Sequence, residues 1–183
     1  MGAVFQEECS VHIVCNEAMS VRNLSVKKLT MAGVMAALVF VMTYLPKVPV
    51  PVTGGYVHLG DGAIFLSVLL LGPLGIPAAA VGSGLADILG GYMVYALPTM
   101  LIKALVALIA WKIWQEGTWL RAAIAFVLAE AAMVAGYFVF ESFMYGAAAA
   151  WSAVGPNCIQ GIAGVALGLV CHGLYPRLKR LVK

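Results

Sequence analysis

The sequence has 183 residues, of which 63% are hydrophobic and 10% charged, with a formal net charge of +3 and a mean hydropathy of +0.98. Soluble domains carry about a quarter charged residues, so this chain cannot cover a water-facing surface and its solvent must be lipid. A membrane span takes about 20 apolar residues. Six spans nearly exhaust the chain, which excludes an additional soluble catalytic domain, ATPase or receptor ectodomain.

The first residues differ from the remainder of the chain. Residues 1–24 are mixed in character and lack the basic start and long apolar run of a signal peptide. We expect a disordered N-terminal extension, or a translation start placed too early, followed by a transmembrane domain over residues 25–183.

Prolines and glycines divide the apolar remainder into segments. The sequence therefore predicts an all-α integral membrane protein, a six-transmembrane-helix bundle. In chain order the spans are expected over Leu29–Leu45, Asp61–Leu71, Leu74–Leu89, Tyr95–Trp114, Trp119–Met144 and Val154–Leu174. Pro46–Gly60 is expected to be a long external loop, and Tyr145–Ala153 a second one.

Lysine and arginine placement predicts the orientation, because cytoplasmic loops carry an excess of these residues. With six spans, all but one of the lysines and arginines in loops, termini or span ends fall on one side, which is therefore expected to be cytoplasmic together with both termini. The residues concerned are Arg22, Lys27, Lys28, Lys112, Arg121, Arg177, Lys179, Arg180 and Lys183. Only Lys47 lies in a loop on the opposite side.

Polar residues gather toward the outer ends of the predicted spans. Charged side chains in hydrocarbon are costly and usually face a bundle interior or a water-filled cavity. The pattern predicts an outward-facing pocket for a small, polar, ring-shaped molecule. The residues at these depths are Asp61, Asp87, Lys103, Glu141, Asn157 and Gln160.

Structural roles are the alternatives for these residues. Asp61 suits a helix cap, whereas Asp87, near a helix C-terminus, needs a partner such as Lys103 or a ligand. Glu130 lies too deep for an outer pocket, so we expect it to pair with Lys103 across two spans. Asn157 and Gln160 could instead bond neighbouring helices.

Other motifs are few. The cysteines show no zinc-ligand spacing, and no metal site or cofactor is expected. There is no Walker A motif, so the chain is not expected to hydrolyse ATP. Small residues four apart, which allow close helix approach, occur at Ala32 and Ala36, and at Gly164 and Gly168.

Three segments resemble a known family. They are Gly55-Tyr56-Val57-His58-Leu59-Gly60-Asp61, Gly72-Pro73-Leu74-Gly75 and Gly82-Ser83-Gly84-Leu85-Ala86-Asp87-Ile88-Leu89-Gly90-Gly91-Tyr92. They are similar to the substrate-binding S components of energy-coupling factor (ECF) vitamin transporters, in the riboflavin-type group that includes proteins for hydroxymethylpyrimidine or pyridoxine. The resemblance covers about residues 25–183.

The resemblance implies a plasma-membrane subunit that captures a vitamin near the outer face. Such subunits topple in the membrane and deliver the vitamin through a transmembrane T subunit that carries two ATPase subunits. The implied T-subunit contacts are Ala32 and Ala36. The implied substrate-binding residues are Tyr56, His58, Asp61, Asp87, Tyr92, Tyr95, Lys103, Glu141, Asn157 and Gln160.

Hydroxymethylpyrimidine or a pyridoxine-like vitamer is favoured over riboflavin, because the polar set suits a small ring rich in hydrogen bonds. The alternatives are a solitary membrane enzyme that uses Asp61, Asp87 and Glu141 as acid–base groups, an ATPase-independent transporter, and a scaffold held together by small-residue packing.

Overall fold

A computed structural model of the chain describes residues 26–50, 53 and 55–182. The chain divides into two compact units, Met1–Met31 and Ala32–Lys183. Of the first unit only residues 26–31, the start of a helix, are described, so the expected N-terminal extension lies outside the described residues. The account below concerns the second unit.

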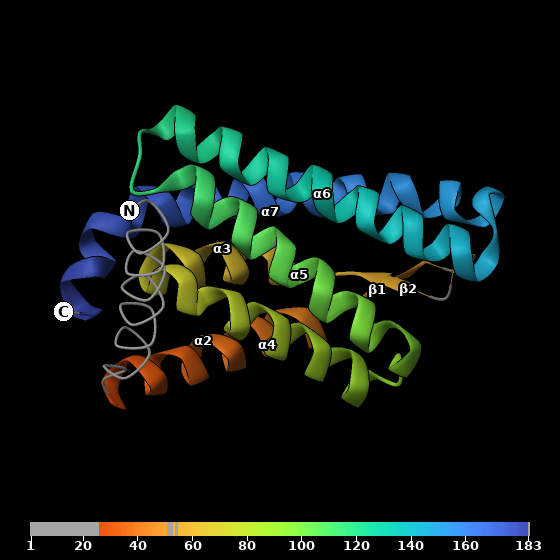
Figure 1. Ribbon diagram of the computed structural model, residues 1–183, viewed down its shortest axis with the longest axis horizontal. Helices are drawn as coiled ribbons and strands as arrows, with labels where there is room; N and C mark the ends of the chain where they lie inside the picture. Colours follow the sequence, from red (N-terminus) through yellow and green to blue (C-terminus); the bar gives the residue numbers. More distant parts are fainter. Residues whose placement is uncertain (1–25, 51–52, 54, 183) are drawn as a thin grey trace, which may run out of the picture. The chain divides into compact units, whose positions relative to one another are not determined.

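The described part of the chain is helical apart from one hairpin of short strands (Figure 1). The helices are α2 (Val26–Tyr44), α3 (Gly60–Leu71), η1 (Gly72–Leu74), α4 (Gly75–Gly90), α5 (Met93–Trp114), α6 (Trp119–Tyr145) and α7 (Ala147–Val182). The strands are β1 (Val48–Val50) and β2 (Gly55–Val57). The prediction of an all-helical membrane bundle is confirmed at this level.

Five of the described segments are long and apolar enough to cross a membrane, and Gly60–Gly90 counts as one of them. It contains α3, with 12 residues, and α4, with 16. At 1.5 Å per residue these helices are about 18 and 24 Å long, less than the roughly 30 Å of a bilayer core. The predicted second and third spans are therefore helices, but each alone is short for a crossing.

Two predictions of loops are wrong. Within Pro46–Gly60, Val48 pairs with Val57 and Val50 with Gly55 in an antiparallel hairpin, since proline excludes a helix but tolerates extended backbone. Residues 147–153 belong to α7, and a single glycine, Gly146 with φ +87°, links it to α6.

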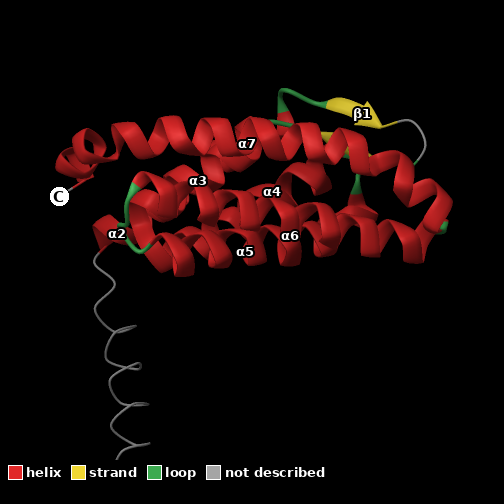
Figure 2. Cartoon of the chain, turned by 90° about the horizontal axis from the view of Figure 1, so that it is seen from above, coloured by secondary structure: helices red, strands yellow, loops and turns green. Residues whose placement is uncertain are grey.

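The last helix is also longer than expected. It was predicted to end before Pro176, but α7 runs for 36 residues and contains both Pro156 and Pro176. Figure 2 shows it extending along the whole bundle, with β1 near one end.

Helix α3 lies in the centre of the bundle, where Ile64, Phe65 and Val68 are fully buried. Its neighbour α7 comes close because of the glycine pair identified in the sequence. A Cβ atom at Gly168 would lie 2.7 Å from the Phe65 ring, and one at Gly164 would lie 3.0 Å from the Asp61 Cβ. The pair thus packs inside the bundle.

The outer surface of the bundle is apolar. Large hydrophobic side chains on α4, α5, α6 and α7 are exposed, among them Leu89, Leu97, Phe143, Ile159 and Ile162. A water-soluble monomer rarely exposes continuous apolar surface on this scale. The surface is that of a multi-pass membrane protein.

Candidate functional site: a polar cavity beside the hairpin

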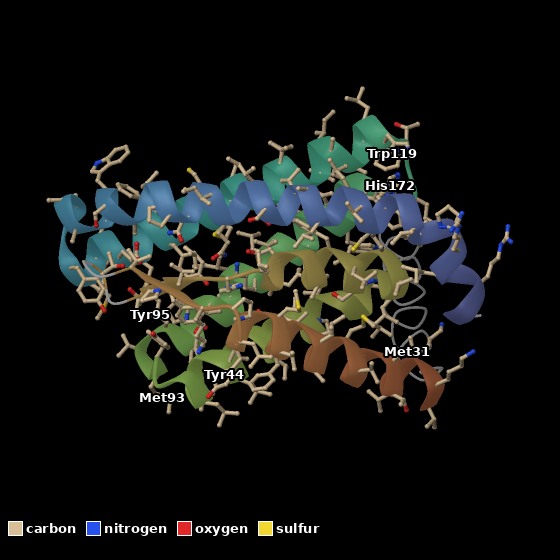
Figure 3. All side chains as sticks on the ribbon, turned by 180° about the vertical axis from the view of Figure 1, so that it is seen from behind. Met31, Tyr44, Met93, Tyr95, Trp119 and His172 are labelled. Atoms are coloured by element: carbon tan, nitrogen blue, oxygen red, sulfur yellow. The ribbon has the colours of Figure 1, made fainter. Side chains whose placement is uncertain are left out.

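A cavity lies where the hairpin meets α4, α5, α6 and α7. Its lining residues are Val50, Gly55, Tyr56, His58, Asp87, Tyr95, Thr99, Tyr137, Glu141, Ala153, Asn157 and Gln160. Figure 3 shows Tyr95 near this end of the bundle, and Trp119 and His172 at the opposite end.

The cavity has a volume of about 20 Å³, room for about one water molecule; about 390 Å³ is reached only when all the empty space out to its open mouth is counted. Pockets for small ligands typically enclose about 300–1,000 Å³. A ring-shaped ligand can therefore enter only if lining side chains move apart.

Strand β2 and the residue that follows it make two hydrogen bonds at the cavity. The Tyr56 hydroxyl donates a hydrogen bond to Oδ1 of Asp87 at 2.5 Å. The backbone N–H of His58 donates to Oε1 of Gln160 at 2.9 Å. These contacts tie the hairpin to α4 and to α7, so the proline-rich segment forms one wall of the cavity.

Two buried carboxylates face the cavity from different helices. Asp87, near the end of α4, and Glu141, near the end of α6, are 2% and 3% exposed. Each has one oxygen in contact with a tyrosine hydroxyl. Tyr56 bonds Oδ1 of Asp87, as described above, and the Tyr95 hydroxyl lies 3.2 Å from Oε1 of Glu141. The other oxygens, Oδ2 of Asp87 and Oε2 of Glu141, have no hydrogen-bond partner among the described residues.

Neutral polar groups complete the walls. The Tyr95 hydroxyl also lies 3.0 Å from the carbonyl oxygen of Thr53, and the Tyr137 hydroxyl donates to the Thr99 hydroxyl at 3.1 Å. Thr99 and Thr53 lie close enough to interact with Asp87 and Glu141 respectively. Tyrosine and threonine hydroxyl groups therefore surround the two acids.

An ion pair lies deeper in the bundle and does not line the cavity. Nζ of Lys103 is 2.6 Å from Oδ1 of Asp61, and these side chains are 0% and 1% exposed. The second oxygen of Asp61 accepts from Nε2 of Gln160 at 2.7 Å. Both oxygens of Asp61 and both ends of the Gln160 amide are therefore occupied, and the network links α3, α5, α7 and the hairpin.

Glu130 has a different environment from the one expected. It is 4% exposed, and neither carboxylate oxygen has a hydrogen-bond partner among the described residues. The expected pairing of Glu130 with Lys103 is wrong, because Lys103 bonds Asp61 instead. Glu130 packs against Gly161 and Gly164 of α7.

Two titratable groups of the hairpin have shifted pKa values. Burial, together with the positive charge of Lys103, lowers the pKa of His58 to about 3. Nδ1 of His58 accepts the backbone N–H of Gly60 at 3.0 Å, so the neutral ring is the form that fits. Burial and the bond to Asp87 raise the pKa of Tyr56 well above its ordinary value.

An aromatic cage surrounds the ammonium group of Lys47 beside the cavity. Nζ lies 4.4, 4.5 and 5.1 Å from the ring centroids of Tyr44, Tyr56 and Tyr92. Tyr56 and Tyr92 also pack together, 4.5 Å apart. Burial lowers the pKa of Lys47, and Asp87 partly opposes this shift.

The sequence-predicted residues thus separate into two groups. Those that line the cavity are Tyr56, His58, Asp87, Tyr95, Glu141, Asn157 and Gln160. Asp61 and Lys103 lie in the deeper ion pair, and Tyr92 packs behind Tyr56.

The prediction missed several lining residues, of which Thr99 and Tyr137 carry polar groups. Both share a helical face with a predicted residue, because Thr99 lies one turn from Tyr95, and Tyr137 one turn from Glu141. In the described part of the chain no group of three or more His, Cys, Asp or Glu side chains is placed to hold a metal ion.

The predicted interface residues Ala32 and Ala36 are half-buried on α2. The Ala36 carbonyl oxygen faces Gly82 of α4, where a Cβ atom would collide with it. Gly33 and Ala37, one position further along the chain, are exposed.

Comparison with known proteins gives consistent matches. The sequence model of the family described as "ECF-type riboflavin transporter, S component" matches residues 23–177. A thiamine precursor transporter, HmpT, from Lactococcus lactis subsp. cremoris is 31% identical over 163 residues, covering 85% of this chain and 91% of that protein. An uncharacterized protein from Pyrococcus woesei is 36% identical over 134 residues, covering 71% of this chain and 88% of that protein.

A solved structure, the S component of a bacterial ECF transporter, has the same fold. It superposes with a TM-score of 0.65 and 23% sequence identity, covering 86% of this chain and 98% of that one. The family match extends over most of the transmembrane bundle and includes every cavity-lining residue. The chain belongs to the family of S components of ECF-type riboflavin transporters.

Proposed function

We propose that this protein is the substrate-capture subunit of an ATP-driven vitamin importer and that the cavity beside the hairpin is its binding site. The observation that carries the proposal is the pair of buried carboxylates, Asp87 and Glu141. Both line one cavity in a membrane bundle, and each has an oxygen with no hydrogen-bond partner in the part of the chain that the structure describes. Polar groups buried in a membrane usually serve a function.

The cavity opens on the extracellular side of the plasma membrane in this proposal, with six crossings and both termini cytoplasmic. The charge distribution supports it, because Lys112 and Arg121 flank the α5–α6 turn and Arg177 and Arg180 lie near the end of α7. In Figure 1 the α5–α6 turn and the end of α7 lie at the end of the bundle away from the hairpin. Basic residues favour the cytoplasmic face.

The favoured substrate is hydroxymethylpyrimidine, with a pyridoxine-like vitamer next and riboflavin possible. The similarity to a thiamine precursor transporter supports the first choice. The carboxylate groups of Asp87 and Glu141 and the amide group of Asn157 can bond the amino and hydroxyl groups of a small ring. The small volume of the cavity suits a single ring better than a tricyclic one.

Calorimetric titration of the purified protein with hydroxymethylpyrimidine, pyridoxine, riboflavin and pantothenate tests the proposal. One of the first three is expected to bind with one-to-one stoichiometry, and mass spectrometry of the purified protein is expected to detect the same compound if it is retained. Absence of binding to every vitamin-like compound would refute it.

Delivery is proposed to proceed through a T subunit and two ATPase subunits, with Ala32 and Ala36 at the contact. Changing both residues to leucine is expected to abolish uptake while ligand affinity is retained. Ala166→Leu, at an exposed alanine on α7, is the control and is expected to leave uptake intact. Loss of ligand binding in the double variant would instead place the patch in the bundle core, against α4.

A further inference from the structure

The cavity presents two hydrogen-bond acceptors in fixed positions. Tyr56 holds one oxygen of Asp87 and Tyr95 lies against one oxygen of Glu141, which leaves Oδ2 and Oε2 for a ligand. The two acids come from α4 and α6. A ligand between these helices can therefore be held from two directions by the same kind of group, an acceptor.

No lysine or arginine among the described residues lines the cavity beside these acids. Lys103 is absent from the lining and is paired with Asp61. His58 does line the cavity, but its pKa of about 3 keeps it neutral near pH 7. Lys47 lies outside the lining, where its ammonium group is held among three tyrosine rings.

We infer that the cavity selects a ring that carries N–H or O–H donors and is neutral or cationic, and that it excludes the phosphorylated form of the same ring. This inference rests on the proposed function and concerns the same site. A donor group on the ring forms a hydrogen bond to the second oxygen of Asp87 or of Glu141. Leaving a buried acceptor without a hydrogen bond costs free energy. A phosphate brings negative charge and acceptor oxygens against two acids, where like charges in a buried site repel strongly.

The chemical class follows from this complementarity. Aminopyrimidines and pyridine vitamers with amino or hydroxymethyl groups fit as free alcohols or amines. Their phosphate esters have the same ring but replace a donor hydroxyl by an anion. The site is thus expected to bind the dephosphorylated vitamer, which a phosphatase reaction releases from the phosphate ester.

The test compares matched ligands on the purified full-length protein. Calorimetry or equilibrium binding is carried out with 4-amino-5-hydroxymethyl-2-methylpyrimidine and its monophosphate, and with pyridoxamine and pyridoxamine 5′-phosphate. We expect the phosphate ester of whichever ring binds to be weaker by about 100-fold or more.

Isosteric variants assign the selectivity to the two acids. Asp87→Asn and Glu141→Gln are each expected to reduce the ratio of affinities between free and phosphorylated ligand by about tenfold. Glu130→Gln, which removes a buried carboxyl group outside the cavity lining, is the matched control and is expected to keep the wild-type ratio.

The outcomes separate this inference from the proposed function. If none of the four compounds, pyridoxine or riboflavin binds the wild-type protein, the proposed function fails. If the phosphorylated and free rings bind the wild-type protein equally well, the function stands and the inference is wrong. An unchanged ratio in both Asp87→Asn and Glu141→Gln would also overturn it.

Discussion

The buried ion pair between Asp61 and Lys103 gives a sharp prediction about stability. In Asp61→Asn the Lys103 ammonium, which is 0% exposed, loses its carboxylate partner. Removing one member of a buried pair typically costs about 3–5 kcal/mol because the remaining charge is left uncompensated. At about 2–4 °C per kcal/mol for a protein of this size, the midpoint of thermal unfolding is expected to fall by about 6–20 °C.

The assay is thermal unfolding of the purified protein in detergent, and two further variants calibrate it. Lys103→Met combined with Asp61→Asn removes both charges and is expected to recover most of the loss. Lys179→Gln breaks a pair of the same N–O distance, 2.6 Å, whose side chains are 38% and 60% exposed. Exposed pairs are screened by water and contribute little to stability, so that midpoint is expected to move little.

The comparison of the two ion pairs isolates the effect of burial. An Asp61→Asn midpoint within 2–3 °C of wild type, on the order of 1 kcal/mol, would refute the reasoning. A double variant no more stable than Asp61→Asn alone would show that lost packing, and not uncompensated charge, causes the effect.

Three further predictions follow from particular contacts. Glu130→Gln removes a buried carboxyl group that has no hydrogen-bond partner among the described residues, so the unfolding midpoint is expected to stay equal or rise; a loss of more than about 1 kcal/mol in the free energy of unfolding would indicate a partner outside those residues. The pKa of His58 is lowered from 6.5 to about 3, so unfolded chains bind the extra proton. Stability is therefore expected to be complete above about pH 6.5 and to fall toward pH 3 by up to about 1.4 kcal/mol per pH unit; a His58→Gln variant with the same pH profile would argue against this assignment. Gly168→Ala places a Cβ 2.7 Å from the Phe65 ring and is expected to cost about 1–3 kcal/mol, whereas Gly155→Ala on the same helix, with open space around it, is expected to be neutral or stabilising in the same melting assay.

The sequence predicted the lipid-facing bundle and the end of the bundle where the polar groups gather. Both inferences rest on composition and on depth along each helix, and these quantities can be counted directly. Asp87 and Glu141 were placed near the ends of their spans in this way, and both line the cavity.

Depth also separates the predicted residues that line the cavity from those that lie below it. Lys103 shares a helical stripe with Tyr95, but eight residues at 1.5 Å each place it about 12 Å deeper. Its partner could not be chosen from spacing alone. The sequence suggested Asp87 or Glu130, whereas the packing of α3 against α5 and α7 brings Asp61 to Lys103.

Two structural features depended on tertiary contacts that local patterns do not contain. The proline-rich segment was read as a loop because proline excludes a helix, yet the bond from His58 to Gln160, 102 residues away, helps hold it as a hairpin over the cavity. The prolines of α7 suggested a helix end at Pro176, but α7 continues through it. Prolines are tolerated in membrane helices when neighbouring groups satisfy the freed backbone carbonyls.

The measurement that tests the central claim most directly is ligand titration of the purified wild-type protein beside the double variant Asp87→Ala, Glu141→Ala. The account predicts that a vitamin or vitamin precursor binds the wild-type protein one to one and that the double variant, still folded by circular dichroism, loses at least about 100-fold in affinity. Binding that survives the loss of both carboxylates unchanged would place the site elsewhere in the protein and contradict the account.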